Sequence, residues 1–227
     1  MPITTPPTIV SVCVGQPRQL GDAQRSVQSG IVKRPVTGSV AVGYKNLAGD
    51  GQADLSVHGG RDKAIYVYSH EHYAYWRDVL DRDLAPAQFG ENLTVAGLTE
   101  VDAVIGARYR IGSAEVVVAQ PRLPCFKLGL HIGDERFPAT FLQSGRLGFY
   151  LRVVRTGELV VGDRFELLDT PADGLSVTRL WELVFAEPQN VAHSVELQHA
   201  LDELPYLDDG WRRRLRGRLR ATGEAAP

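Results

Sequence analysis

The chain has 227 residues, of which 44% are hydrophobic and 23% charged, so it can bury a substantial core and is not expected to be disordered. Its 25 Lys and Arg residues almost balance its 27 Asp and Glu residues, which excludes a whole-chain positive field for nucleic acid or an anionic membrane. Cys13 and Cys125 are the only cysteines, too few for a disulfide framework, a four-cysteine zinc site or an iron–sulfur cluster held by this chain.

Targeting and membrane signals are weak throughout the sequence. The N-terminus lacks the basic start and apolar run of a signal peptide. No segment reaches the ~18 unbroken apolar residues of a membrane helix. A cytoplasmic protein that contacts no membrane is therefore expected.

Short strands dominate the first two thirds of the chain. Residues 9–14 alternate in a strand pattern and end at Gly15-Gln16-Pro17. Similar short stretches, punctuated by glycines and turns, follow at residues 40–43, 64–68, 93–95, 109–112, 115–119, 151–154 and 163–167. Many short strands with close turns favour a barrel or sandwich over a layered parallel sheet.

Two helical segments are expected among these strands. Ser69 is predicted to cap the first helix, and Pro86 to lie beyond its end. Four of its residues have the spacing of a buried stripe: His72, Trp76, Val79 and Leu80. The second segment follows Cys125 and runs to about Leu142, with boundaries blurred by glycine and proline.

The composition changes at the turn-rich residues 169–174, which have the character of a linker. Beyond them the pattern predicts three short helices, the first capped by Ser176 and the second by Asn190. The second carries Val195, Leu197, Ala200, Leu201 and Leu204, and the third is marked by Trp211, Leu215 and Leu219. We therefore expect a β domain over 1–168, a linker over 169–174 and a three-helix domain over 175–227.

Cys125 gives the strongest chemical signal. A hydrophobic strand runs into Pro121 and Pro124, which restrict the backbone just before the cysteine. Arg122 and Lys127 are near enough in sequence to favour a thiolate, the form that attacks electrophiles or binds soft metals. The alternative is a cysteine used as a small hydrophobe, and that interpretation suits Cys13, which lies inside an apolar strand.

Three further loops carry polar groups that a ligand can use. Gly59 and Gly60, between His58 and Lys63, leave backbone N–H groups unshielded, as in loops that cradle phosphate. Lys33-Arg34-Pro35 is an extended basic pair, and Phe89-Gly90-Glu91-Asn92 places an amide at the start of a strand. Taken singly, each of these loops is equally well explained as an ordinary surface turn.

Six short motifs nevertheless occur together in a specific order. They are Lys33-x-Pro35-Val36, Gly49-Asp50-Gly51-Gln52-Ala53-Asp54, Val57-His58-Gly59-Gly60-x-Asp62-Lys63-Ala64, His70-Glu71-His72-Tyr73, Phe89-Gly90-Glu91-Asn92-Leu93 and Gln120-Pro121-Arg122-x-Pro124-Cys125. The set resembles the MOSC family, named after the C-terminal domain of molybdenum cofactor sulfurase, and is most similar to its YiiM-like branch. The resemblance covers nearly the whole chain and implies a mainly β fold with α, a MOSC-type β-barrel followed by a small C-terminal three-helix bundle.

The resemblance also implies an activity and a site. It implies a molybdenum–pterin cofactor in a basic cleft, with Cys125 as the thiolate ligand to molybdenum and reactive residue. By position, the residues expected around the cofactor are Lys33, Arg34, His58, Gly59, Gly60, Lys63, Asn92 and Arg122. It implies an oxidoreductase that reduces small-molecule N-hydroxylated substrates such as hydroxylaminopurine. The electrons for this reduction would come from a separate reductase.

Other functions remain open at this stage. Cys125 would serve equally as a persulfide carrier that delivers sulfur to a metal centre. A non-catalytic binding module is the third possibility, although the charge balance argues against nucleic acid as its partner. A homodimer is left open. Because the chemical motifs all precede residue 169, the helical tail is predicted to be dispensable for cofactor binding.

Overall fold

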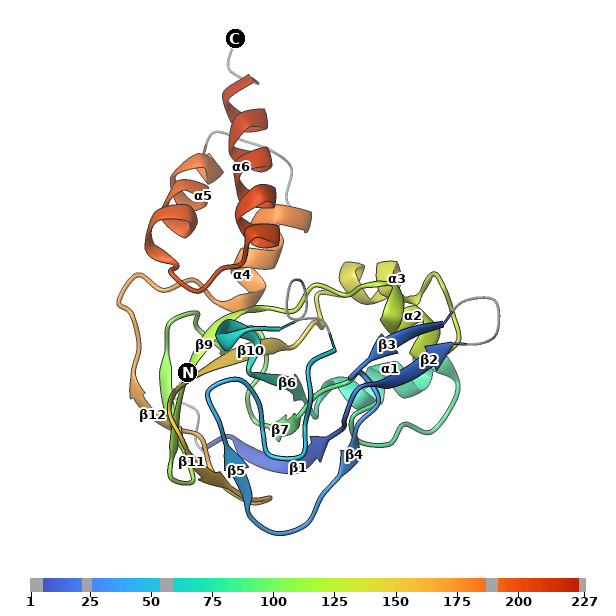
Figure 1. Cartoon of the computed structure of the whole chain (residues 1–227). Helices are drawn as coiled ribbons and strands as arrows, with labels where there is room; N and C mark the ends of the chain where they lie inside the picture. Colours follow the sequence, from blue (N-terminus) through green and yellow to red (C-terminus); the bar gives the residue numbers. More distant parts are fainter. Residues whose placement is uncertain (1–5, 22–25, 54–58, 187–191, 225–227) are drawn as a thin grey trace.

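The computed structural model describes residues 6–21, 26–53, 59–186 and 192–224 of the chain. Eight strands form one sheet: β1 (Thr8–Val14), β4 (Arg34–Pro35), β6 (Ile65–Ser69), β7 (Leu93–Ala96), β8 (Arg108–Ile111), β9 (Ala114–Pro121), β10 (Phe149–Arg155) and β12 (Glu166–Asp169). Their order is β12-β8-β9-β10-β6-β7-β1-β4, and the sheet curls on itself into a half-barrel (Figure 1). Two small sheets complete the β structure, β2 (Arg18–Gly21) with β3 (Ser26–Ser29) and β5 (Val40–Val42) with β11 (Gly157–Leu159).

The strands are antiparallel except for β6 and β7, which run parallel. The connection between these two carries helix α1 (His72–Leu80), as a parallel pair requires a crossover. Alternation along β10 shows how the sheet divides its side chains: Phe149, Leu151 and Val153 are buried in the core, whereas Tyr150 and Arg152 lie on the opposite face. The predicted mainly β barrel is thus confirmed.

Seven of the eight predicted strands lie within two residues of observed strands and one is shifted, whereas β2, β3, β4 and β11 were not predicted. The last strand of the sheet lies at Glu166–Asp169 rather than at residues 163–167. Asp163 and Phe165 form backbone hydrogen bonds with the chain at the start of β1, where the N–H of Ile9 donates to Asp163 and Phe165 donates to Pro7. Because of these long-range hydrogen bonds, residues 163–165 do not pair with β8, and the pairing of β12 with β8 begins at Glu166.

The buried face of α1 differs from the prediction. Tyr73 and Trp76 are buried, whereas Val79 is 45% exposed. The reason is tertiary: Trp76 stacks on Phe141 with ring centroids 5.3 Å apart, which fixes the orientation of the helix. Ser69 is not its cap, because its hydroxyl donates to the carbonyl of Leu98 at 2.6 Å.

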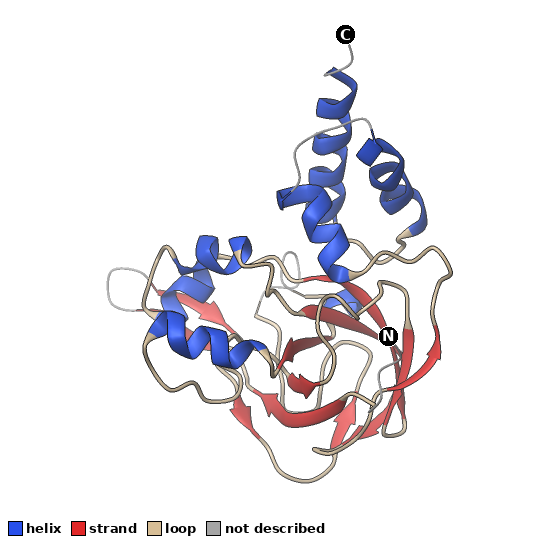
Figure 2. Cartoon of the chain, turned by 180° about the vertical axis from the view of Figure 1, so that it is seen from behind, coloured by secondary structure: helices blue, strands red, loops and turns tan. Residues whose placement is uncertain are grey.

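Helices α2 (Phe126–Ile132) and α3 (Phe137–Gln143) occupy the helical segment predicted after Cys125. Figure 2 shows α1, α2 and α3 grouped at one flank of the sheet, away from the C-terminal helices. Gly133 ends α2 with a φ of 87°, a left-handed conformation that glycine adopts without strain. The aromatic cluster around Trp76 joins these helices to the sheet.

The tail contains α4 (Val177–Trp181), a π-helical turn (Glu182–Ala186), α5 (Ala192–Glu203) and α6 (Asp209–Glu224). Ser176 caps α4 as predicted, since its Oγ accepts from the N–H of Arg179 at 3.0 Å. Of the apolar residues expected on the second helix, Leu197 and Ala200 are buried, whereas Val195 is 75% exposed because it lies on the opposite side of α5. Asn190 lies outside the described residues.

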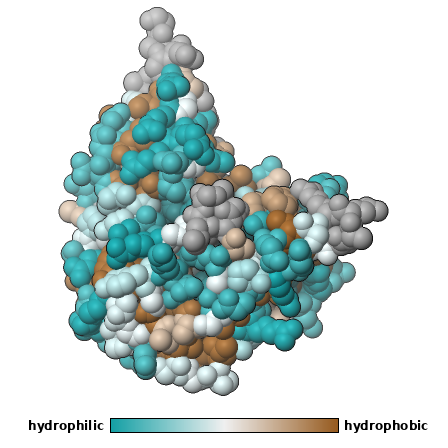
Figure 3. Space-filling model, viewed as in Figure 1, coloured by the Kyte–Doolittle hydropathy of each residue, from teal (hydrophilic) through white to brown (hydrophobic). Residues whose placement is uncertain are grey.

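The tail packs on the barrel through one continuous cluster of buried residues. Trp211 and Leu215 of α6 belong to the same cluster as Val116 and Val118 of β9. On the outer surface, hydrophilic side chains dominate the visible face of the tail (Figure 3). The division into two domains at residues 169–174 stays a prediction. Separately, none of the described helices is long and apolar enough to cross a membrane.

Candidate functional site

A pocket opens where β3, β6, β9 and β10 meet the loops before β4 and after β5. Its empty volume, which includes solvent space at the open mouth, is about 660 Å³. Among the described residues that line it, four are basic and one is acidic. The polar and reactive lining residues are Ser29, Lys33, Asp50, Gln52, Lys63, Tyr66, Asn92, Arg122, Cys125, Lys127 and Tyr150.

Cys125 reaches the pocket because β9 ends at Pro121 and α2 begins at Phe126, so the cysteine stands between strand and helix. It is half-buried and in no disulfide. Cys13 is also in no disulfide, but it is fully buried in β1, and burial raises the pKa of its thiol to about 11. The two cysteines therefore lie in different surroundings, one at a pocket and one in the core, and the role of Cys125 stays a prediction.

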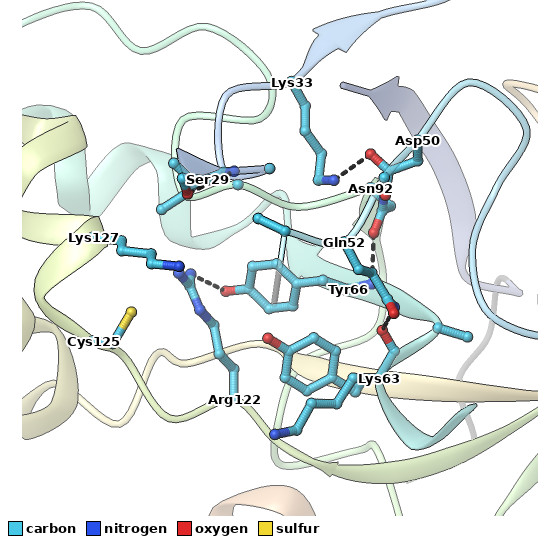
Figure 4. A pocket seen from close by; sticks show the side chains of 17 residues that line it. Ser29, Lys33, Asp50, Gln52, Lys63, Tyr66, Asn92, Arg122, Cys125 and Lys127 are labelled. Carbon is cyan, nitrogen blue, oxygen red and sulfur yellow. Dashed lines mark hydrogen bonds and ion pairs between the residues drawn. The ribbon is translucent and has the colours of Figure 1, made fainter. Parts of the chain in front are cut away.

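Arg122 and Lys127 flank Cys125 on the same side of the pocket (Figure 4). Arg122 is only 6% exposed, and its guanidinium lies 4.6 Å from the ring centre of Tyr66. Nη1 donates to the carbonyl of Phe89 at 2.6 Å and to the hydroxyl of Tyr66 at 3.1 Å, which leaves Nε and Nη2 to a ligand. Lys127 donates to the carbonyl of Gln28 at 3.2 Å.

Neither cation has a carboxylate within ion-pair distance in the described part of the chain. A buried cation needs a compensating anion, since the cost of removing charge from water is large. The Arg122–Lys127 side of the pocket is therefore suited to an anionic ligand held beside a thiol.

The opposite side of the pocket is held by a buried polar network. Lys33 pairs with Oδ1 of Asp50, which also accepts from the N–H of Gly15 at 2.9 Å. Burial lowers the pKa of the Lys33 ammonium, and the charge of Asp50 opposes that shift. Asn92 donates to Oδ2 of Asp50 at 2.9 Å, and its Oδ1 accepts from the N–H of Tyr66 at 3.0 Å. This side of the pocket is electrically balanced within the protein.

The structure brings five of the predicted residues into one pocket: Lys33, Lys63, Asn92, Arg122 and Cys125. Three others are placed differently. Arg34 is exposed in β4, where it pairs with Val14 in the strand ladder. Gly59 and Gly60 are not among the lining residues, and the N–H of Gly60 donates to Gln52 at 3.1 Å. His58 lies outside the described residues.

Several lining residues were missed by the sequence prediction as site residues. Asp50 lies within the motif of residues 49–54. Its contacts in the pocket are with Lys33 and Asn92, which are distant in sequence. Tyr150 lies on the face of β10 opposite the core, and burial raises the pKa of its phenol, so the hydroxyl stays protonated. The alternation of Phe149, Tyr150 and Leu151 was the available signal for this residue.

The described residues contain no group of three or more His, Cys, Asp or Glu side chains placed to hold a metal ion.

The two thiols should differ sharply in reactivity. With iodoacetamide at pH 8, we expect one thiol, Cys125, to react in the native protein and both to react in denaturant. At that pH only ~0.1% of Cys13 is thiolate for its pKa of about 11, and burial blocks access as well. Its labelling should increase as the pH approaches 11. Peptide mapping by mass spectrometry measures both sites, and faster native labelling of Cys13 would contradict the assignment.

The fold and the pocket together define a class: a β-barrel protein with a thiol set among cations in a pocket. Residues 54–166 match the family model described as the MOSC domain. The Bacillus subtilis protein called Uncharacterized protein YflK is 40% identical over 205 residues, which cover 90% of this chain and 91% of that protein. The chain belongs to the MOSC family, and it is YiiM-like.

Two further similarities refine that placement. The crystal structure of YiiM from Geobacillus stearothermophilus has a TM-score of 0.76 and 34% identity, and the match covers 94% of this chain and 100% of that one. A Gibberella moniliformis protein named Reductase is 31% identical over 211 residues, which cover 91% of this chain but 36% of that protein. The resemblance to a YiiM-like MOSC protein is thus confirmed.

Proposed function

We propose that this protein is a molybdenum-cofactor-dependent oxidoreductase that reduces N-hydroxylated compounds such as hydroxylaminopurine. The observation that carries the proposal is Cys125 beside Arg122 and Lys127, two cations without a carboxylate partner among the described residues. Membership of the MOSC family supports it, as does the similarity to a protein named Reductase.

The residues present fit a molybdenum–pterin cofactor. Its phosphate is an anion that the unused N–H groups of Arg122 and the ammonium of Lys127 can bind. The thiolate of Cys125 is a soft ligand that suits the metal better than a carboxylate or imidazole. When bound, this cofactor supplies a two-electron centre able to accept oxygen from an N–OH group.

The chain's own residues have the tasks of binding and proton donation. Reduction of an N–OH group consumes two electrons and two protons and releases an amine and water. The protonated hydroxyl of Tyr150 lines the pocket and can donate a hydrogen bond to the departing oxygen. The electrons have to come from a separate reductase, and a cytoplasmic location is part of the proposal.

A second function uses the same thiol without a metal. As a persulfide carrier, Cys125 would accept sulfur and pass it on. Elemental and pterin analysis of protein made in a cofactor-competent host separates the two. Molybdenum and pterin near one equivalent support the oxidoreductase, whereas neither of them, with a persulfide on Cys125, supports the carrier. Strong, salt-dependent binding to DNA would instead favour a binding module.

Arg122 provides the mutational test of cofactor binding. Arg122→Lys keeps the charge but loses the guanidinium fork, so it should weaken cofactor retention by ~1 to 3 kcal/mol. Excess cofactor should partly restore occupancy, measured as pterin and molybdenum per chain. Arg213→Ala, on the exposed face of α6, should have no effect. Equal occupancy in both variants would place the anion site elsewhere.

A further inference from the structure

The tail forms an ion pair with a residue that lines the pocket. Asp208 lies just before α6, and its Oδ2 is 2.6 Å from Nζ of Lys63, which lines the pocket. Both side chains are largely buried. The ion pair links the C-terminal segment to Lys63, which the resemblance to the MOSC family places around the cofactor.

Asp208 is held in place by several contacts rather than by Lys63 alone. Its Oδ1 accepts from the N–H of Trp211 at 2.8 Å, and its own N–H donates to Oε1 of Gln120 at 2.8 Å. The indole of Trp211 donates to the carbonyl of Pro121 at 2.9 Å. The carboxylate is thereby fixed to the Gln120-Pro121-Arg122 segment that leads to the thiol.

The ionisation of Asp208 is also favoured. Burial works against the charged form, but the hydrogen bonds from Lys63 and from the N–H of Trp211 outweigh it, so the pKa of Asp208 lies below its ordinary value. A second contact supports the same junction: Arg152 pairs with Asp62 and lies over the ring of Tyr206 at 5.1 Å. The tail thus presents a fixed negative charge to the pocket.

We propose that Asp208 restricts where anions bind, by offsetting the charge of Lys63 and leaving Arg122 and Lys127 as the anion-binding end. The reason lies in the pairing of the four lining cations. Asp50 offsets Lys33 and Asp208 offsets Lys63. An anion approaching Lys63 meets a carboxylate already there, whereas no carboxylate competes at Arg122 in the described residues. The inference rests on the proposed function in one respect, the binding of an anionic ligand in this pocket.

The test is pyrophosphate binding to the full-length chain, made in a host without molybdenum cofactor and followed by calorimetry. Asp208→Asn keeps the size of the side chain and an oxygen for the N–H of Trp211, but removes the charge beside Lys63. We expect it to bind pyrophosphate roughly tenfold more tightly than the wild type, with a steeper loss of affinity in salt. Asp209→Asn removes the same charge from the exposed neighbouring residue and should leave the affinity unchanged.

A further substitution shows whether Lys63 causes the gain in pyrophosphate affinity of Asp208→Asn. Adding Lys63→Met to Asp208→Asn should abolish the gain, because the cation released from Asp208 is then missing. If Asp208 has only a structural role, pyrophosphate should bind more weakly, not more tightly, to Asp208→Asn and to Asp208→Asn with Lys63→Met. Unchanged or weaker binding by Asp208→Asn, or an equal gain in Asp209→Asn, would overturn the inference. Wild-type protein that binds no pyrophosphate at all, together with Asp208→Asn that binds none, would instead count against the anion pocket of the proposed function.

Discussion

Cys125→Ser should lower the reduction of an N-hydroxylated purine by more than roughly 100-fold, since even partners outside the ligand shell of a metal contribute 10- to 100-fold. Serine has nearly the size of cysteine, so the β9–α2 connection should keep its shape. Its hydroxyl is a poor ligand for a soft metal and a weak nucleophile at neutral pH. Turnover with an added reductase and molybdenum content per chain measure the loss, and the melting temperature reports the fold.

Cys13→Ser is the matched control for this prediction. It makes the same atomic change at a fully buried position of β1 that does not line the pocket, although the carbonyl of Cys13 accepts from the side chain of Asn92 at 3.2 Å. We expect turnover per folded molecule to stay at the wild-type level, while stability falls because a hydroxyl replaces a buried thiol. Equal loss of turnover in the two variants would remove the special role of Cys125.

Asp50→Ala should cause the largest loss of stability, about 3 to 5 kcal/mol in the free energy of unfolding, the range for breaking a buried ion pair. The substitution leaves the buried ammonium of Lys33 without its carboxylate, and it removes the acceptor for the N–H of Gly15 and for the amide of Asn92. Urea denaturation of the full chain measures the change. Glu166→Ala removes one carboxylate of an exposed pair with Arg110 and should cost less than about 1 kcal/mol.

The loss in Asp50→Ala should depend on pH. Burial lowers the folded pKa of Lys33, so its ammonium costs stability at neutral pH, and this cost disappears as the pH rises toward the unfolded value. Without Asp50 the folded pKa falls further. The difference between Asp50→Ala and the wild type should therefore shrink between pH 7 and pH 10. A double change, Asp50→Ala with Lys33→Met, should recover most of the stability at pH 7. A constant difference across that range would show that the network is not controlled by the charge of Lys33.

Local sequence patterns predicted most of the strands, the helical segments and the cysteine that lies at the pocket. Alternation of apolar residues depends on neighbours along the chain, and so does the restriction that Pro121 and Pro124 impose before Cys125. The contrast between Cys125 and Cys13 was predictable for the same reason. The motifs as an ordered set were sufficient to indicate the MOSC family.

Only the tertiary structure decided which of the polar residues act together. Arg34 and Lys33 are adjacent in sequence, yet Lys33 reaches the pocket and Arg34 is exposed in β4. Asp50 forms an ion pair with Lys33, and Asp208 forms one with Lys63, although the partners are far apart in sequence. An ion pair depends on distance in space and on burial, and neither quantity can be calculated from spacing along the sequence. The sequence therefore indicated the thiol and its cations, whereas the folded chain determined which of those cations keep their charge available for a ligand.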